Sequence, residues 1–411
     1  MEHRSTDLRK YAEYMTSAEF FDRPVGSDGS GANGRVPKTL LCVLERPTQF
    51  DVPLWSALSR RNHLRPLVWY FDKNSTFIDP ETGQSVVWDN DEDVSYTTEY
   101  ISHDDLNWRF LSLSIPPAAV ITEGWAHRYT WWLGMQCWRR GVPIILPSDR
   151  IHNPEERTAR KIARRALRRV CQPMFGGHIS PGTLGLAALK ADGIADSRLA
   201  KSLYPIDVDM HQRRCSDQSA DARTIRNRWP AGSKVVIAVA KHAERESPLL
   251  VVETFARARL RDPTIKLLFV GDGPLHAEVV ARVETLGLGP DVYLPGYVKY
   301  ALLPGYYGAA DVFMHVAQFE PWGISVSEAM ACGLPVVATR NIGSSHDLVI
   351  AGKSGAISDR DDPEELAMKL LEVLSFAGSA ESKAVIAERV RSVDVESAAA
   401  ELEALVDRIN P

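Results

Sequence analysis

The sequence predicts an α/β protein built from two doubly wound domains that face a central cleft. Three observations support this fold class. The chain has 411 residues, which is more than a single hydrophobic core usually serves. Short apolar runs alternate with amphipathic helical stretches, a pattern typical of parallel sheets flanked by helices. Two such series follow one another, separated by a polar and charged stretch at 207–232.

The first domain is expected over 37–206, after an N-terminal segment at 1–36 whose Gly-, Ser- and Asp-rich end predicts mobility. An amphipathic stretch and a polar insertion at 72–99 interrupt its strands. The buried strands are predicted at 39–44, 66–71, 118–122 and 142–146.

The second domain is expected over 233–390, after a linker at 207–232 that also holds its first helix. A C-terminal helix is predicted over 391–411. The strands of the second domain are predicted at 235–239, 265–270, 292–294, 312–315 and 336–338, with a helix between each pair. Open α/β sheets bind ligands at the carboxyl ends of their strands, so the cleft between the domains is the expected ligand site.

The composition argues against several other classes of protein. The 45% hydrophobic and 25% charged residues are typical of a globular protein, and the net charge of -5 gives no reason to expect a nucleic-acid partner. No apolar run is long enough to cross a bilayer, and the charged N-terminus lacks the apolar centre of a signal peptide. We therefore expect a cytoplasmic protein that meets a membrane, if at all, at its surface.

The cysteines predict reduced thiols. They are odd in number, scattered along the chain and without any CxxC spacing, which argues against a disulfide framework and against a zinc site. They are Cys42, Cys137, Cys171, Cys215 and Cys332.

The most informative segment begins at Glu320 and indicates in order a loop, a helix and a strand. Glu320 precedes the predicted helix, and Glu328 lies in its first turns. Gly323 lets a ligand approach the backbone, and the N–H groups of Gly323, Ile324 and Ser325 at the helix start can hold an anion. A sugar joined to a nucleotide diphosphate would satisfy both carboxylates and the helix start. The alternative is an ordinary helix and strand with solvated glutamates.

The segment 319–355 resembles the donor-site signature of retaining glycosyltransferases of family 4. In that family two glutamates precede a Gly-x-Pro-Val-Val strand. The later segments 343–349 and 352–355 of this chain are part of the same resemblance. The similarity is strong over 235–374 and weaker in the first domain. It implies the GT-B architecture of two facing Rossmann-like domains, with the acceptor on the first and the nucleotide sugar on the second.

The resemblance also implies roles for the paired carboxylates. Glu328 would accept hydrogen bonds from the ribose hydroxyls, and Glu320 would accept them from the transferred sugar, because an ionised carboxylate suits a diol. Trp322 would form a wall of the sugar pocket. A glycosidase-like pair of acid and nucleophile is disfavoured, since it needs carboxylates facing each other across a bond. The residues expected near the nucleotide base, unless their two turns are simple connections, are Gly271, Gly296, Tyr297 and Val298.

A second loop, which follows a strand and leads into an apolar helix, carries the expected cations. Ser247 suits an N-cap and Pro248 suits the first helical turn. Lys241 and Pro248 match the family pattern that grips the diphosphate, whereas Glu246 stands where the family has its second cation. We expect Arg245 to supply that charge and, with Lys241, to stabilise the leaving diphosphate. The alternative is a solvated turn at Arg245 and Glu246.

Polar residues after the strands of the first domain are the acceptor-side candidates. The resemblance puts a histidine near the reacting sugar, and His127 is the nearest candidate, although a lone histidine is also compatible with a structural role. Trp125 can stack on a sugar face or pack in the core. Arg128 and Asp149 complete the predicted acceptor site, where a short polar loop suits hydroxyl groups or an anion.

Two charged segments have alternative interpretations. A basic helix with an apolar stripe is predicted at 157–169; it suits anionic lipid or a phosphorylated acceptor, or is a solvated face. Asp89, Asp91 and Asp93 contain the Asp-x-Asp spacing that binds a divalent ion in the other large glycosyltransferase fold. Because they lie in the polar insertion, we interpret them as a surface loop and expect no metal site.

The predicted function is transfer of a sugar from a nucleotide diphosphate sugar to a hydroxyl of a carbohydrate or small-molecule acceptor. Retention of anomeric configuration follows from the resemblance. The donor, UDP- or GDP-linked, is a co-substrate, and no cofactor is expected. A sugar-nucleotide epimerase of the same architecture and a non-catalytic nucleotide-sugar-binding relative remain alternatives. A dehydrogenase is disfavoured, because no strand is followed by a complete dinucleotide fingerprint. Acceptor, sugar, base and oligomeric state stay open.

Overall fold

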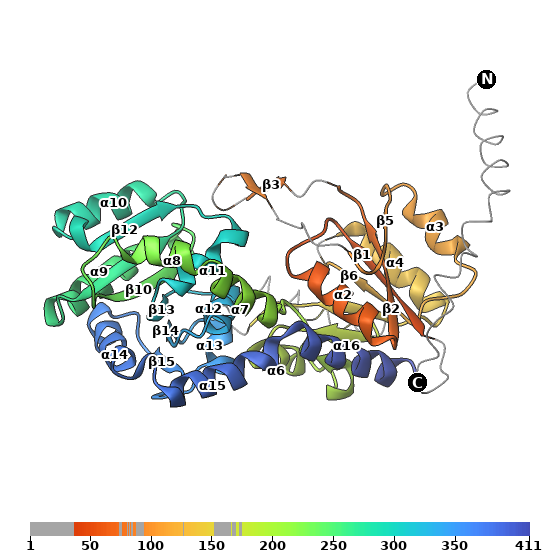
Figure 1. Cartoon of the computed structure of the whole chain (residues 1–411). Helices are drawn as coiled ribbons and strands as arrows, with labels where there is room; N and C mark the ends of the chain where they lie inside the picture. The colour runs from red at the N-terminus through yellow and green to blue at the C-terminus, as the bar shows by residue number, and fades with distance from the viewer. Residues whose placement is uncertain are drawn as a thin grey trace, which may run out of the picture. The chain divides into compact units, whose positions relative to one another are not determined.

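The computed structural model describes residues 37–411, apart from gaps at 74–75, 80, 82, 84, 88–93, 126, 152–165, 167–169 and 172–174 (Figure 1). Three predicted features therefore lie outside the described residues. They are the N-terminal segment 1–36, the Asp-x-Asp loop, and all the basic residues of the helix predicted at 157–169.

Two parallel sheets form the framework of the chain. The first has seven strands in the order β5-β2-β1-β6-β7-β8-β9, and the second has six in the order β12-β11-β10-β13-β14-β15. In both, the strand order reverses near the first strand of the sheet, and helices connect the strands. This is the doubly wound arrangement in two copies, so the predicted fold class is confirmed.

In the first sheet, four of the strands coincide with predicted apolar runs. The others, β5, β8 and β9, are only two to four residues long and have no apolar run that would mark them in the sequence. The strands are β1 (Lys38–Leu44), β2 (Leu64–Tyr70), β5 (Thr97–Tyr100), β6 (Ala119–Thr122), β7 (Ile144–Pro147), β8 (Gly177–Ile179) and β9 (Leu199–Ala200), and the helices are α2 (Asp51–Arg61), α3 (Leu106–Ser112), α4 (Arg128–Arg139) and α6 (Thr183–Ala191).

The polar insertion holds a small hairpin of its own. Strands β3 (Thr76–Ile78) and β4 (Ser85–Val87) pair only with each other, in an antiparallel two-stranded sheet. In the sequence the hairpin lies between β2 and β5, two strands of the first sheet, but it is not part of that sheet.

In the second sheet, all five predicted strands are present and one more, β15, is added at the edge. Helices α7 and α8 occupy the predicted linker. The strands are β10 (Lys234–Val239), β11 (Ile265–Val270), β12 (Val292–Gly296), β13 (Val312–His315), β14 (Val336–Thr339) and β15 (Gly355–Ser358), and the helices are α7 (Val208–Asp217), α8 (Ser219–Arg226), α9 (Pro248–Arg261), α10 (His276–Thr285), α11 (Leu303–Gly308), α12 (Ile324–Ala331), α13 (Gly343–Leu348), α14 (Pro363–Phe376), α15 (Ala380–Val390) and α16 (Val395–Ile409).

The central strands are apolar on both faces because helices cover both sides of each sheet. All six residues of β11 are buried, as are the last five of β1. The longest helix in the described part of the chain, α16, has 15 residues. Among the described residues no helix is long and apolar enough to cross a membrane.

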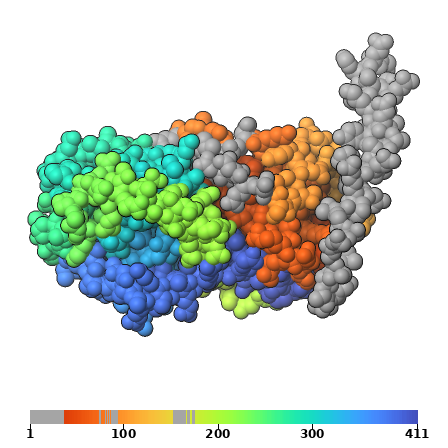
Figure 2. All heavy atoms as spheres, viewed as in Figure 1, coloured from red at the N-terminus to blue at the C-terminus, as the bar shows by residue number. Residues whose placement is uncertain are grey.

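The C-terminal helix α16 returns to the first domain. Its apolar stripe joins the core of that domain and packs against α2 and the strands β8 and β9. The helix lies beside α2 (Figures 1 and 2). The buried residues of this stripe are Val395, Ala398, Ala399, Leu402, Leu405 and Val406. The last helix of the chain therefore belongs to the core of its first domain.

Truncation of this stripe tests that packing. Leu402 is fully buried, so replacing it by Ala is expected to lower the free energy of unfolding by about 2–5 kcal/mol through lost burial and a cavity. Urea denaturation followed by circular dichroism measures the change. The neighbouring exposed Glu401→Ala variant should behave like the wild-type chain. Equal stability of both variants would contradict the packing of α16.

One pair of cysteines contradicts the prediction of reduced thiols. Cys215 of α7 and Cys332 at the end of α12 form a disulfide, with their Cα atoms 6.2 Å apart. They are 117 residues apart in the sequence, and they meet because α7 packs against α12. Spacing along the chain gives no sign of such a pair. Cys42, Cys137 and Cys171 are unpaired.

Candidate active site

A cavity of about 930 Å³ lies where the carboxyl ends of strands from both sheets meet. Open α/β sheets bind their ligands at these strand ends. Residues at or directly after the strand ends line it from both domains: Leu44, Thr122, Pro147 and Ile179 from the first, and Val239, Val270 and His315 from the second.

Most of the predicted site residues line this cavity. Those that do are His127, Asp149, Lys241, Arg245, Gly271, Tyr297, Val298, Glu320, Trp322, Gly323, Ile324 and Ser325. Four that do not are Glu328, Gly296, Trp125 and Arg128. The structure therefore brings together the two loops singled out in the second domain, and it separates Glu320 from Glu328.

The helix predicted after Glu320 begins as expected. Gly323 is the N-cap of α12 and has a φ of 84°, a left-handed conformation that favours glycine. An added Cβ there would lie 3.0 Å from Ile342 Cγ2 and 3.3 Å from Glu320 Cγ. The residue thus allows a tight turn that brings the start of α12 to the wall of the cavity.

Glu328 lies deeper, inside α12. Its side chain is only 4% exposed, and its carboxylate accepts a 2.9 Å hydrogen bond from Tyr307 Oη. Burial raises the pKa of Glu328 to about 7. Since Glu328 is outside the lining of the cavity, its contact with a ribose stays a prediction.

Trp322 lines the cavity and also fills the space between the domains. It is 2% exposed, and a Cβ added to Gly182 of the first domain would lie 2.3 Å from its ring. Beside it, Asp347 at α13 accepts hydrogen bonds of 2.9 Å from Thr183 N and 3.0 Å from Lys201 Nζ. These contacts form a close joint between the domains next to the cavity.

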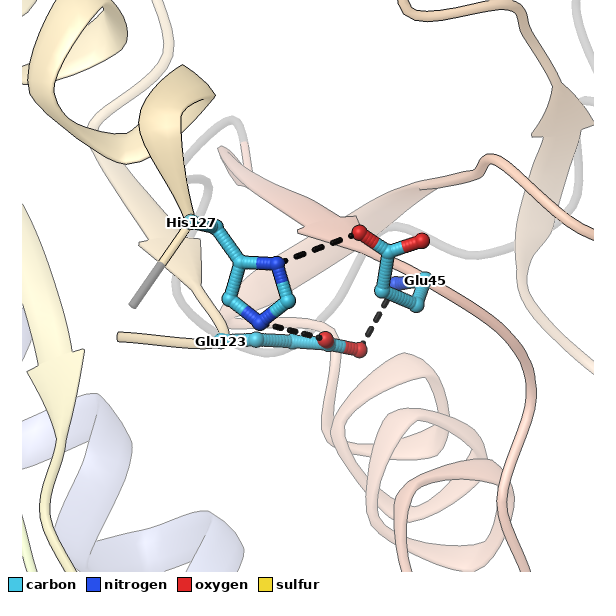
Figure 3. A group of neighbouring side chains, drawn as sticks. All are labelled: Glu45, Glu123 and His127. Carbon is cyan, nitrogen blue, oxygen red and sulfur yellow. Dashed lines mark hydrogen bonds and ion pairs between the residues drawn. The ribbon is translucent and has the colours of Figure 1, made fainter. Parts of the chain in front are cut away.

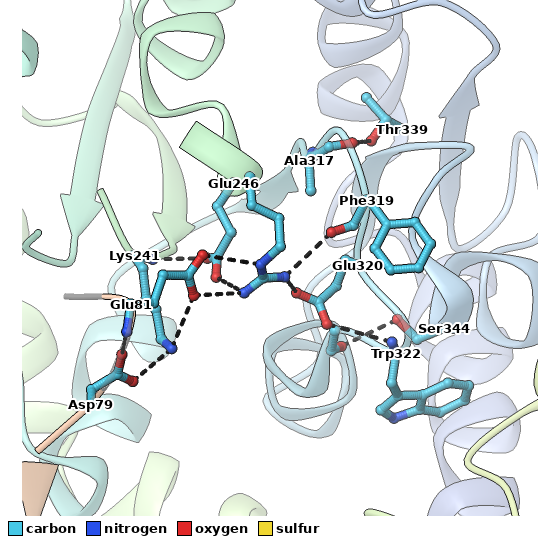
Figure 4. Close-up of polar contacts among 12 residues, drawn as sticks. Asp79, Glu81, Lys241, Glu246, Ala317, Phe319, Glu320, Trp322, Thr339 and Ser344 are labelled. Carbon is cyan, nitrogen blue, oxygen red and sulfur yellow. Dashed lines mark hydrogen bonds and ion pairs between the residues drawn. The ribbon is translucent and has the colours of Figure 1, made fainter. Parts of the chain in front are cut away.

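The predicted cation Lys241 is paired with carboxylates of the first domain. Its Nζ lies 2.7 Å from Asp79 Oδ2 and 3.3 Å from Glu81 Oε2 (Figure 4). Both acidic residues come from the segment between β3 and β4, which the sequence indicates only as a polar insertion. These contacts join residues about 160 positions apart, so the sequence around either residue does not predict them.

Arg245 makes contacts with three carboxylates. Its Nε lies 3.1 Å from Glu81 Oε1, its Nη2 lies 2.8 Å from Glu246 Oε1, and its Nη1 bonds Glu320 (Figure 4). Hydrogen bonds from Arg245 hold the pKa of Glu81 below its usual value, which keeps that carboxylate charged. Arg245 and Glu320, both predicted site residues, are therefore neighbours. They bind each other, and Arg245 also binds Glu81 and Glu246.

Glu246, which stands where the resemblance implies a cation, is part of this cluster. It is 6% exposed, accepts a 2.8 Å hydrogen bond from the Lys241 backbone N–H and lines the cavity. Burial raises its pKa to about 7. The alternative of a solvated turn at Arg245 and Glu246 is therefore wrong, because the carboxylate is buried and fixes the backbone of Lys241.

The prediction that the side chain of Ser247 caps helix α9 is wrong. Ser247 occupies the N-cap position in a left-handed conformation, with φ at 44°, but its side chain makes no capping hydrogen bond. Pro248 follows at the first helical position and removes one N–H group that a cap would otherwise satisfy.

The loops expected near the nucleotide base are held together at Gly271. Its N–H donates a 2.9 Å hydrogen bond to Gly296 O, and an added Cβ would lie 1.8 Å from Ala240 O. Tyr297, which follows Gly296, is 47% exposed and lines the cavity together with Val298. A role in reading the base stays a prediction for these residues.

On the first-domain side, His127 lies between two glutamates that follow strand ends. Its Nδ1 is 3.2 Å from Glu45 Oε1, and its Nε2 is 3.5 Å from Glu123 Oε2 (Figure 3). The Glu45 N–H also donates a 2.6 Å hydrogen bond to Glu123 Oε1. Burial raises the pKa of Glu123 to about 7. The one signal in the sequence was the position of each glutamate directly after a strand.

The ligand atoms of this cluster lie within 4.8 Å of one another, close enough to hold a metal ion. A metal would need both carboxylates and one ring nitrogen to converge on a single point. Here each carboxylate faces a different ring nitrogen of His127, so the geometry suits hydrogen bonding better than metal binding.

The remaining acceptor candidates lie elsewhere. Trp125 packs against Trp131 and Phe175, with ring centroids 5.1 Å and 4.7 Å apart. It lines a second pocket of about 230 Å³ that shares Asp149 with the main cavity. Arg128 is the exposed first residue of α4. Sugar stacking by Trp125 and acceptor binding by Arg128 therefore stay predictions.

His315 is a cavity residue that the sequence did not single out. It ends β13, is 3% exposed, and neither of its ring nitrogens has a hydrogen-bond partner among the described residues. Burial lowers its pKa, which favours a neutral ring. Its position at the end of a predicted strand is the one feature of the sequence that could have indicated a site residue.

Comparison with known proteins shows what the second domain is similar to. Residues 221–392 match the model of the family described as "Glycosyl transferases group 1". The chain is 31% identical over 160 residues to the mannosylfructose-phosphate synthase of Agrobacterium fabrum, covering 37% of this chain and 35% of that protein. It is 28% identical over 194 residues to the GDP-mannose-dependent alpha-(1-6)-phosphatidylinositol monomannoside mannosyltransferase of Mycolicibacterium smegmatis, covering 45% and 50%. The matches thus span a third to a half of these relatives.

Solved structures match over most of the chain. The structure of Anabaena Alr3699/HepE in complex with UDP and glucose superposes with a TM-score of 0.64 at 16% identity, covering 89% of this chain and 98% of that one. A glycosyltransferase from Rickettsia africae gives a TM-score of 0.68 at 12% identity, covering 91% and 98%. The chain therefore has the GT-B fold of these glycosyltransferase structures, and its residues 221–392 match the glycosyl transferases of group 1.

Proposed function

We propose that this chain is a glycosyltransferase that moves a sugar from a nucleotide diphosphate sugar to a hydroxyl of a carbohydrate or small-molecule acceptor. The observation that carries the proposal is the convergence of Lys241, Arg245, Glu320 and the start of α12 on one cavity between two domains. Cations and helix N-termini stabilise the charge that develops on a leaving diphosphate. A carboxylate beside them accepts hydrogen bonds from sugar hydroxyls.

The similar proteins support a nucleotide sugar as donor. One relative is named as dependent on GDP-mannose, and a structural neighbour was solved with UDP and glucose. The donor we propose is therefore UDP- or GDP-linked. It acts as a co-substrate, and the reaction needs no further cofactor.

We place the reaction with family 4 and propose retention of anomeric configuration. The bond between the anomeric carbon and the phosphate oxygen breaks, and the acceptor oxygen bonds to the same face of that carbon. The acceptor's proton passes to the departing phosphate oxygen. Glu123 and His127 line the first-domain side of the cavity, where they can orient the acceptor hydroxyl.

A ligand screen followed by product analysis tests this function. Thermal shift with UDP, GDP, ADP and dTDP sugars should identify at least one donor, because binding to the folded state raises its apparent stability. Incubation with that donor and a mixture of sugar acceptors should give a glycoside with the donor's anomeric configuration by NMR. Stabilisation by no donor, or an epimerised sugar nucleotide formed without acceptor, would contradict the proposal.

Metal removal gives a separate prediction. Lys241, Arg245 and the start of α12 supply the charge that a divalent ion supplies in metal-dependent enzymes, so transfer should proceed at its full rate in excess EDTA. The initial rate of nucleotide release measures this. EDTA-treated enzyme given excess Mg²⁺ is the matched control. Loss of activity in EDTA with recovery in Mg²⁺ would show that a metal ion, and not these protein groups alone, stabilises the leaving diphosphate.

The predicted contact with anionic lipid through 157–169 stays a prediction outside the described residues. Co-sedimentation with vesicles tests it, since equal binding to anionic and neutral vesicles would remove the idea.

A further inference from the structure

The hairpin β3–β4 places two carboxylates on the cations that the proposed donor needs. Asp79 follows β3, and Glu81 lies in the connection between β3 and β4. Asp79 contacts Lys241, and Glu81 contacts both Lys241 and Arg245 (Figure 4). Glu81 therefore bridges the two cations, and Asp79 adds a second carboxylate on Lys241.

Arg245 has no hydrogen-bonding capacity left for a phosphate. A guanidinium offers five N–H donors. Nε donates to Glu81 at 3.1 Å, Nη2 donates to Glu81 at 3.2 Å and to Glu246 at 2.8 Å, and Nη1 donates to Glu320 and to Phe319 O. A phosphate oxygen can therefore bind Arg245 only after one of these acceptors has left.

The balance of charge gives the same result. Four carboxyl groups, those of Asp79, Glu81, Glu246 and Glu320, surround two cations. The cluster is net negative even when Glu246, whose pKa burial raises to about 7, is protonated. Such a cluster repels a diphosphate. Departure of the hairpin pair leaves two carboxylates with two cations and removes that repulsion.

Asp79 and Glu81 are the carboxylates with the weaker attachment to the site. Glu246 is held in place by the backbone N–H of Lys241, and Glu320 precedes α12 in the same domain. The hairpin comes from the other domain, has three residues in each strand, and forms a sheet with no further strand. Two-stranded hairpins of this length are marginal in stability.

We propose that Asp79 and Glu81 occupy the diphosphate site of the resting enzyme and that donor binding requires the β3–β4 hairpin to release Lys241 and Arg245. The inference rests on the proposed function. It also gives Asp79 and Glu81 a role in specificity. A ligand must offer two anionic groups to replace two carboxylates, so a nucleoside diphosphate displaces the hairpin and a nucleoside monophosphate does not.

The double variant Asp79→Asn with Glu81→Gln tests the proposal on the full chain. Titration calorimetry with UDP, GDP, UMP, GMP and inorganic pyrophosphate should show about tenfold tighter binding of the diphosphates and of pyrophosphate than in the wild type. The preference for diphosphate over monophosphate should shrink. The matched control is Glu99→Gln, which removes the carboxylate partner of Arg109 in the same domain and should leave each affinity unchanged.

A second measurement follows the hairpin itself. In the wild type, a saturating diphosphate should speed amide hydrogen exchange in Thr76–Ile78 and Ser85–Val87, because the hairpin loses its ion pairs. Increased protection of these amides on binding would overturn the proposal, even if the substituted protein folded poorly.

The outcomes separate this inference from the proposed function. Diphosphates that bind the wild type and bind the double variant equally or more weakly would refute the hairpin's role and leave the glycosyltransferase standing. Tighter pyrophosphate binding by the variant with no nucleotide binding would support the hairpin's role and reject the donor. Absence of binding of every ligand to both proteins would reject both.

Discussion

Replacing Lys241 by Ala is expected to lower the turnover of sugar transfer by about 10²–10³-fold, the effect of removing one donor that stabilises a developing negative charge. Lys241 lines the cavity just beyond β10, and the described carboxylates that contact its ammonium group are those of the hairpin residues Asp79 and Glu81. Once the hairpin has moved, its ammonium group is available to the leaving diphosphate.

Steady-state kinetics with the donor found by thermal shift measures this loss. The matched control is Lys299→Ala, which removes an exposed lysine of the same domain that lies outside the lining of the cavity. The control should retain the wild-type rate. Turnover of Lys241→Ala close to that of Lys299→Ala would remove Lys241 from the diphosphate site and with it the main support for the proposed function.

Replacing Glu328 by Ala is expected to abolish most of the turnover and to weaken the fold. The hydroxyl of Tyr307 is buried and loses its acceptor, which costs about 1–3 kcal/mol. The conservative Glu328→Gln variant keeps an acceptor for Tyr307 and therefore separates the two effects. If Glu328 binds the ribose, the Gln variant should be stable but should show a raised KM for the donor. Full recovery of kinetics in Glu328→Gln would mean that the residue is only structural.

The same residue gives a prediction of pH dependence. Burial raises the pKa of Glu328 from 4.5 to about 7, so the folded chain binds this proton more tightly than the unfolded chain. Its contribution to stability is then full below pH 4.5 and declines as the pH rises to about 7. Urea denaturation across this range should show a smaller decline for Glu328→Gln. An identical pH profile in both proteins would contradict the buried carboxyl.

The fold was predictable where strands are long and apolar. The strands β1, β10 and β11 have six or seven residues each, nearly all buried, and they appear in the sequence as continuous apolar runs. β9 has two residues, too few to form a pattern. The return of α16 to the first domain was not predictable, because an amphipathic helix specifies that it has a buried face but not what covers it.

The candidate site was predictable where its chemistry is local. The loop that holds Lys241 and Arg245 and the turn at Gly323 are short, and their resemblance to a family signature identified them. What the sequence could not supply was the partners of these residues. Asp79 and Glu81 reach the cations from about 160 residues away, so their charges looked like ordinary features of a polar insertion.

Glu246 is the residue for which the sequence and the structure differ most. In the sequence it is a carboxylate at the position where the resemblance implies a second cation. In the structure it is a buried carboxylate that binds the backbone of Lys241 and the guanidinium of Arg245, so it sets the positions of both cations. A negative residue can therefore support a phosphate site by orienting its positive neighbours.

The most direct test of the central claim is a crystal structure of the full chain with the nucleoside diphosphate that stabilises it. The account predicts diphosphate oxygens within hydrogen-bond distance of Lys241 Nζ, of Arg245 and of the first N–H groups of α12, with Asp79 and Glu81 displaced from the two cations. A nucleotide bound outside this cavity, or a diphosphate without contact to Lys241 and Arg245, would contradict it.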